Sequence, residues 1–202
     1  MSTPGIKKLF EELRGIEVAV IHPAGSDCNV LVDQLKRIGC RVKALWPCPA
    51  ALPPDTAVVF LYIPGDASAP WSATDCGAAL IALVDYENPT VLKGLLEANA
   101  HAVISKPFRP TGVLSTMVLA RSVHGYEKRL LSKVHKLEET LRSRRVIERA
   151  VKLLAERRSL SDVEAYDHIR RQATTKRISI VEVASMIVNA SEVLDGMGPI
   201  NS

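Results

Sequence analysis

Basic and hydroxyl side chains gather in one part of this 202-residue chain, where they could hold the phosphates of a nucleic acid. Residues 121–177 contain about sixteen Lys and Arg against about eight Asp and Glu, whereas residues 1–120 are close to neutral. A basic segment on a neutral protein is typical of a polyanion binder, although a solvated helical surface without a partner would show the same charge. The side chains that we expect to bind are Arg145, Arg149, Lys152, Arg170, Arg171, Thr174, Lys176 and Arg177.

Other reactive side chains do not indicate catalysis or metal binding. The five histidines lie far apart in the sequence, and no nucleophile–base pair or glycine-rich phosphate loop is present. We therefore expect no catalytic residue, no metal and no cofactor, and a protein that is not an enzyme. Four cysteines form no C-x-x-C pair and are expected to be buried thiols: Cys28, Cys40, Cys48 and Cys76.

Short apolar runs alternate with amphipathic segments in the first half of the chain. We expect strands at 16–21, 40–46, 57–63, 79–84 and 102–105. One helix should follow an N-cap at Ser26 and end at Gly39, and another should open at Asn88-Pro89 and run to about Asn99. Apolar strands alternating with helices indicate a parallel sheet covered on both faces. The sequence predicts an α/β fold, with a five-stranded doubly wound (receiver/flavodoxin-like) domain at residues 14–120.

A coiled-coil helix is expected over residues 121–146. Apolar residues there alternate at three- and four-residue spacing, and neither Gly nor Pro interrupts residues 126–195. A helix packing on its own domain would show a similar stripe, but this helix continues far past the first domain. We predict a homodimer through Val123, Leu130, Val134, Leu137 and Leu141.

Two capping boxes divide the remaining segment, 147–195, into a three-helix module. Ser161 with Glu164, and Ser179 with Glu182, fit the S-x-x-E pattern that opens a helix. In the middle helix Ala165, Tyr166, Ile169 and Ala173 should face the core, and Arg170 and Arg171 should point outward. Tyr166 as a base-stacking platform and Arg170 as an ion-pair partner of Glu164 or Asp167 are the alternatives.

This module resembles the ANTAR module of AmiR/NasR-type transcription antiterminators. The resemblance implies binding to leader RNA, where the bound hairpin excludes a terminator, and control by a ligand-sensing negative regulator protein. No apolar run is long enough to span a membrane, and the charged N-terminus has no apolar stretch typical of a signal peptide, so we expect a cytoplasmic protein. The residues that carry the pattern are Ile147, Ala150, Leu154, Glu164, Ala165, Tyr166, Ile169, Arg170, Ala173, Arg177, Val183, Ala184 and Ile187.

The receiver-like half departs from a working phosphoryl acceptor. A receiver needs an acidic pair after its first strand and an aspartate after the third. Here the first strand ends in His22-Pro23, and the third strand contains no carboxylate. We therefore expect a pseudo-receiver without a phospho-acceptor, in which Lys106 has no phosphoryl group to bind. A DNA-binding response regulator and a module that binds an acidic protein are the competing interpretations.

Overall fold

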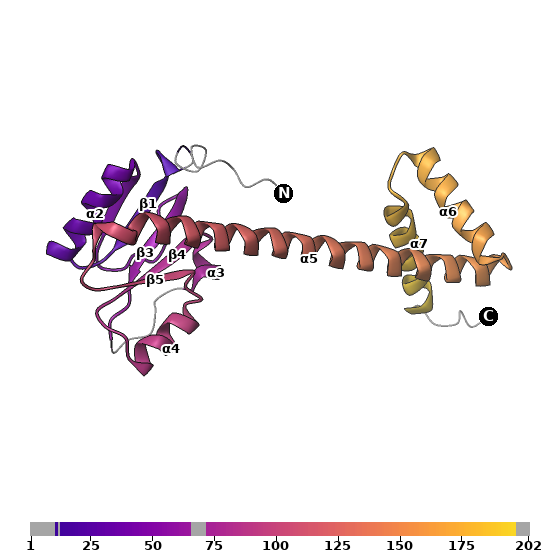
Figure 1. Ribbon diagram of the computed structural model, residues 1–202. Helices are drawn as coiled ribbons and strands as arrows, with labels where there is room; N and C mark the ends of the chain where they lie inside the picture. Colours follow the sequence, from indigo (N-terminus) through magenta and orange to yellow (C-terminus); the bar gives the residue numbers. More distant parts are fainter. Residues whose placement is uncertain (1–10, 12, 66–71, 197–202) are drawn as a thin grey trace. The chain divides into compact units, whose positions relative to one another are not determined.

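The computed structural model describes residue 11 and residues 13–65 and 72–196 (Figure 1). The chain divides into two compact units, Met1–Arg129 and Leu130–Ser202. None of the helices in the described ranges is both long enough and apolar enough to cross a membrane.

The first unit is built on a parallel sheet of five strands. In chain order they are β1 (Glu17–Ile21), β2 (Arg41–Leu45), β3 (Thr56–Tyr62), β4 (Ala79–Val84) and β5 (Ala102–Ser105). Their order in the sheet is β2-β1-β3-β4-β5, and every neighbouring pair is parallel. All six residues of β4 are buried, because helices cover both of its faces. The predicted doubly wound sheet is confirmed.

Helices α2 (Ser26–Ile38) and α5 (Pro110–Arg158) pack on one face of this sheet, through side chains such as Leu35 and Met117. The short α3 (Ala73–Cys76) and α4 (Pro89–Glu97) pack on the other face. Helix α3 was not predicted, because its few small residues carry no helical periodicity.

Two details of the predicted helices and cysteines are wrong. Ser26 is the first residue of α2, and Gly25 takes the N-cap position with no side-chain hydrogen bond. Cys28 and Cys40 are buried, but Cys48 and Cys76 are only half-buried. Burial raises the pKa of the Cys28, Cys40 and Cys48 thiols, which keeps them protonated at neutral pH.

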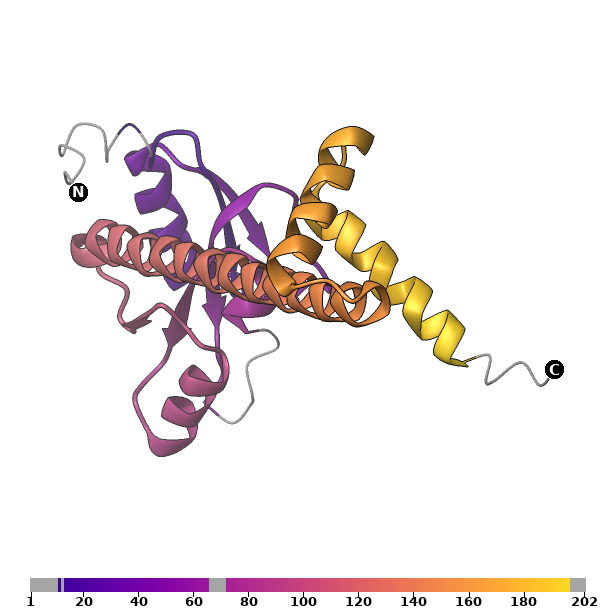
Figure 2. The same ribbon diagram turned by 90° about the vertical axis from the view of Figure 1, so that its right-hand side faces the viewer.

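The second unit consists of the C-terminal part of α5, α6 (Asp162–Lys176) and α7 (Ile180–Gly196), which contact one another (Figure 2). Helix α5 has non-helical backbone at Thr111 and Gly112, near its start; its residues up to Arg129 belong to the first unit and those from Leu130 to the second. The three predicted helices are confirmed. Their core is small and aliphatic: Ala150, Val151, Ala155, Ala165, Ile169, Ala173, Val183, Ala184 and Val188.

Both predicted capping boxes are present. The Ser161 Oγ accepts a hydrogen bond from Glu164 N, and the Glu164 carboxylate accepts one from Ser161 N at 2.9 Å. Ser179 and Glu182 repeat the pattern, with Ser179 N donating to the Glu182 carboxylate at 2.7 Å. These hydrogen bonds lower the pKa of both glutamates. Each box therefore satisfies backbone donors that would otherwise be unpaired at the start of a helix.

We expect Ser161→Ala to destabilise the second unit by about 1 kcal/mol, because the N-cap acceptor for Glu164 N is lost. Ser179→Ala should have a similar effect on α7. Hydrogen exchange of the first-turn amides of α6 and α7 measures the change locally. Ser122→Ala is the control, because Ser122 is exposed within α5 and caps no helix. Equal exchange in Ser161→Ala and the wild type would contradict the prediction.

Candidate nucleic-acid interface

Three of the expected binding side chains come together on α6. Arg170, Arg171 and Thr174 line one hollow of about 620 Å³, together with Asp167 and Thr175. The Thr174 hydroxyl donates to the Arg170 carbonyl at 3.1 Å, and Arg171 Nε donates to the Asp167 carbonyl at 3.4 Å. These contacts stay within the helix, and the two guanidinium groups remain open to solvent. We name Arg170, Arg171 and Thr174 the arginine face.

An ion pair between Arg170 and a neighbouring carboxylate, the alternative from the sequence, is not found. Arg170 takes part in none of the ion pairs among the residues that the structure describes. Glu164 is occupied by its capping box. A guanidinium group that is exposed and unpaired within the chain is available to a phosphate or a base.

Lys176 and Arg177 are exposed at the C-terminal end of α6, beyond the arginine face. Arg177 is the C-cap and has left-handed backbone, with φ 54°, and its N–H bonds to carbonyls of the last helical turn. Such a C-cap ends the helix sharply. Two further cationic side chains therefore follow the arginine face along the chain.

The three expected residues on α5 are not gathered at one place. Arg149 pairs with Glu192 of α7 at 3.0 Å, which offsets its charge. Lys152 lines a separate groove between α5 and α6, and Arg145 is exposed and lines neither hollow. The arginine face is therefore a better candidate for a binding surface than Arg145, Arg149 and Lys152 of α5, which do not share one site.

The prediction that Tyr166 belongs to the core is wrong. Ala165, Ile169 and Ala173 are buried, whereas Tyr166 is 42% exposed. It lines the groove with Ile147 and Val151 instead. Adjacent residues differ by about 100° around a helix, so Tyr166 lies to one side of the buried stripe that Ala165 begins.

In the first unit, the carboxyl edge of the sheet carries a closed network of side chains. Tyr62, the last residue of β3, donates its hydroxyl hydrogen to Asp85, which follows β4, at 2.6 Å. Lys106, which follows β5, pairs with the other Asp85 oxygen at 2.8 Å and with Asp27 of α2 at 3.3 Å. The lysine that would bind a phosphoryl group in a receiver is thus neutralised within the chain.

Aromatic rings fill the space beside this network. His22 is buried after β1, and its Nδ1 donates to the Pro23 carbonyl at 2.7 Å. Its ring centroid lies 4.8 Å from that of Tyr62 and 5.6 Å from that of Phe108. Neither the end of β1 nor the end of β3 offers a carboxylate to a Mg²⁺ ion, which favours oxygen ligands.

Asp85 should make the stability of the first unit depend on pH. The hydrogen bonds from Lys106 and then from Tyr62 lower the pKa of Asp85 below its ordinary value. Its charged form therefore stabilises the fold above the unfolded pKa, about 3.9, and the contribution is lost as the pH falls through the lower folded pKa.

We expect Asp85→Asn to be less stable than the wild type at pH 7, and the difference to shrink near pH 3. Urea unfolding followed by tryptophan fluorescence at both pH values measures it. Asp33→Asn, at an exposed position of α2, is the control and should change little at either pH. A difference that is the same at both pH values would contradict the assignment.

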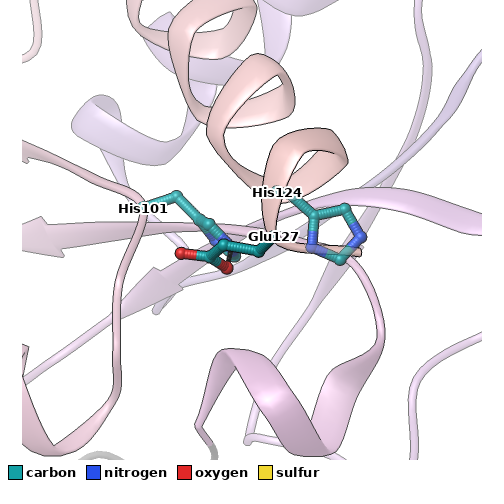
Figure 3. Close-up of side chains that lie close together, drawn as sticks. All are labelled: His101, His124 and Glu127. Atoms are coloured by element: carbon teal, nitrogen blue, oxygen red, sulfur yellow. Dashed lines mark hydrogen bonds and ion pairs between the residues drawn. The ribbon is translucent and has the colours of Figure 1, made fainter. Parts of the chain in front are cut away.

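Two histidines that are distant in sequence meet at α5 (Figure 3). Ligand atoms of His101, His124 and Glu127 lie within 4.8 Å of one another. However, Nδ1 of His101 accepts a hydrogen bond from Leu80 N at 2.9 Å, so the ring proton is on Nε2, which lies 3.1 Å from the Glu127 carboxylate. His101 therefore has no free lone pair for a cation. The cluster is a hydrogen-bonded junction between the start of β4 and α5.

These features define a class of regulator: a receiver-type α/β unit whose described residues place no carboxylate on β3 itself, followed by a basic helical module. Residues 16–121 match the family described as AmiR, N-terminal, and residues 135–188 match the ANTAR domain. The chain belongs to the AmiR family of regulators that carry an ANTAR domain.

Known relatives agree with this assignment. The chain is 32% identical to the aliphatic amidase regulator of Pseudomonas aeruginosa, over 89% of this chain and 94% of the relative. It is 26% identical to the transcriptional regulatory protein PdtaR of Mycobacterium tuberculosis, over 55% of this chain and 54% of that protein. The structure of response regulator StyR is similar in fold, with TM-score 0.52 and 15% identity over 86% of this chain and 98% of that one.

Proposed function

We propose that this protein is an RNA-binding transcription antiterminator, which binds hairpins in a leader RNA and so prevents premature termination. The arginine face is the observation that carries the proposal. It presents two exposed guanidinium groups, neither in an ion pair with another described residue, on α6 of a module that belongs to the ANTAR family. Arginine suits RNA loops because its planar group binds phosphates and stacks on unpaired bases.

A titration against three nucleic acids tests this proposal. A labelled two-hairpin leader RNA from the chain's own operon is compared with the same RNA carrying scrambled loops and with duplex DNA of equal length. We expect tight binding to the first alone, because specific RNA recognition usually targets single-stranded loops. If all three nucleic acids bind equally and their affinities fall equally steeply with salt, the surface binds nucleic acid only through non-specific electrostatic attraction. Preference for the duplex would favour the DNA-binding alternative.

We further propose that two chains pair through α5. The five predicted dimerisation residues define a seam, and all of them are large apolar side chains left exposed in one protomer. A dimer could hold both hairpins of a leader at once, which raises the overall affinity. Sedimentation equilibrium of the full chain should give twice the monomer mass. Leu137→Asp should give the monomer mass, and the exposed Thr174→Asp, which lies outside the seam, should leave the mass unchanged.

Control of the protein by a ligand-sensing negative regulator, rather than by phosphorylation, is also part of the proposal. The part that excludes phosphorylation is supported by the network in which Asp85 and Tyr62 already occupy Lys106 and its surroundings. The sensor protein is proposed from the likeness to the amidase regulator alone. Incubation with acetyl phosphate and Mg²⁺ should add no phosphoryl mass and leave RNA binding unchanged. A phosphorylated species, seen by intact mass, would refute this part of the proposal.

A further inference from the structure

One acidic side chain stands among the basic groups of the arginine face. Asp167 is exposed and lines the same hollow as Arg170 and Arg171, and it is the only carboxylate among the described residues that line this hollow. Phosphates of a nucleic acid are negatively charged, so a carboxylate at this place opposes their binding. Asp167 therefore contributes nothing to phosphate binding.

Asp167 lies within reach of both arginines, but it pairs with neither. It precedes Arg170 by three residues and Arg171 by four, which are the spacings at which side chains meet on a helix. Arg171 Nε instead donates to the Asp167 carbonyl oxygen, at 3.4 Å. Among the described residues the Asp167 carboxylate has no ion pair, so its two oxygens are left as acceptors for a ligand.

The other acidic side chains of α6 stabilise the start of the helix. Asp162 and Glu164 lie in the first turn, where a negative charge interacts favourably with the helix dipole. Glu164 also closes the capping box with Ser161. Asp167 lies beyond the first turn and has neither of these roles.

An ionised carboxylate selects strongly among the four bases of RNA. It can only accept hydrogen bonds, and its two oxygens suit two donors that lie side by side. Guanine alone carries two adjacent donors on its Watson–Crick edge, the N1–H and the N2 amino group. Adenine and cytosine place an acceptor nitrogen beside their amino group, and uracil has one N–H between two carbonyls. The edge of a guanine is open to such contact only where the base is unpaired, as in a hairpin loop.

We propose that Asp167 determines specificity for an unpaired guanine in the RNA loop, by accepting hydrogen bonds from its N1–H and N2 amino groups. The inference rests on the antiterminator function proposed above and adds the base that this surface recognises. Arg171 lines the same hollow one turn further along α6, and arginine donates to the O6 and N7 atoms of guanine. The acidic and basic groups of the hollow thus suit different edges of one base.

Titration of full-length Asp167→Ala against the two-hairpin leader RNA tests the contact, because the sign of the effect separates it from charge alone. Loss of a negative charge by itself should strengthen binding to every RNA. Loss of the guanine contact should instead weaken binding to the leader about tenfold, the size expected for one bidentate base contact. Binding to the RNA with scrambled loops should not weaken.

Inosine in place of the loop guanines gives a second readout, because inosine lacks only the N2 amino group. The wild type should bind the inosine leader about tenfold more weakly than the guanine leader, since a hydrogen bond to a charged group is lost. Asp167→Ala should bind the two RNAs equally. Glu156→Ala is the matched control: Glu156 is exposed on α5 and lines neither hollow, so this variant should discriminate like the wild type. Circular dichroism at 222 nm checks that each variant keeps its helices.

The outcomes separate the guanine contact from the antiterminator function. A wild type that binds the leader and the scrambled-loop RNA equally would refute the function and the contact with it. A wild type that prefers the leader, with Asp167→Ala binding it as tightly or discriminating inosine as before, would refute the contact alone. A preferred leader whose loops contain no guanine would also overturn the contact.

Discussion

The double variant Arg170→Ala/Arg171→Ala is expected to bind the two-hairpin leader RNA about 100-fold more weakly than the wild type. Each arginine contact to a phosphate or base is worth about 1–3 kcal/mol, and a loss of about 1.4 kcal/mol is tenfold in affinity. Both side chains line the same hollow on α6 and are not paired with acidic groups among the described residues. Their removal should therefore take away the proposed RNA contacts without breaking an ion pair among the described residues.

Binding isotherms at several salt concentrations measure this effect. The slope of log affinity against log salt should become shallower by about one for each lost phosphate contact. Arg142→Ala is the matched control, because Arg142 is also exposed, on α5, but lines neither hollow. Similar losses in the control and the double variant would mean that net charge, rather than the arginine face, determines binding.

Ile169→Ala is expected to destabilise the second unit by about 2–5 kcal/mol. Ile169 is fully buried and is the largest buried side chain of its core, where the other buried residues are alanine and valine, so its truncation leaves a cavity. A domain is stable by only about 5–15 kcal/mol, so a small unit would lose much of its stability. RNA affinity should then fall even though Arg170 and Arg171 are retained.

Hydrogen exchange of the α6 amides measures this loss within the second unit, where a whole-chain melting curve would mix both units. Val193→Ala, at a position of α7 that is 60% exposed, should change stability by no more than about 0.5 kcal/mol. Equal protection in Ile169→Ala and Val193→Ala would contradict the assignment of Ile169 to the core.

Much of the fold follows from local patterns. The apolar runs of β3 and β4 predict buried parallel strands, because a strand covered on both faces has no polar positions. Asn88 followed by Pro89 marks the start of α4, and the Asn88 side chain accepts from Val91 N at 2.7 Å. The two capping boxes locate α6 and α7 for the same reason: each needs only residues three apart in the chain.

The candidate site could be predicted only in part. Helical spacing places Arg170 and Arg171 beside the buried stripe of α6, and the structure brings them together with Thr174. Spacing could not show that Arg149 pairs with Glu192, because the two residues lie on different helices. It also misplaced Tyr166, since a side chain at the edge of a buried stripe is covered or exposed according to the neighbouring helix.

The sequence by itself determined the five strands, the limits of α4, α6 and α7, and the basic segment, because each depends on residues a few positions apart. The tertiary structure decided which distant groups meet. Asp85 reaches Tyr62 and Lys106 only because parallel strands end at one edge of the sheet. His101 reaches Glu127 only because α5 packs back over β5. The groove likewise exists only where α6 lies against α5, since its lining combines residues from both helices.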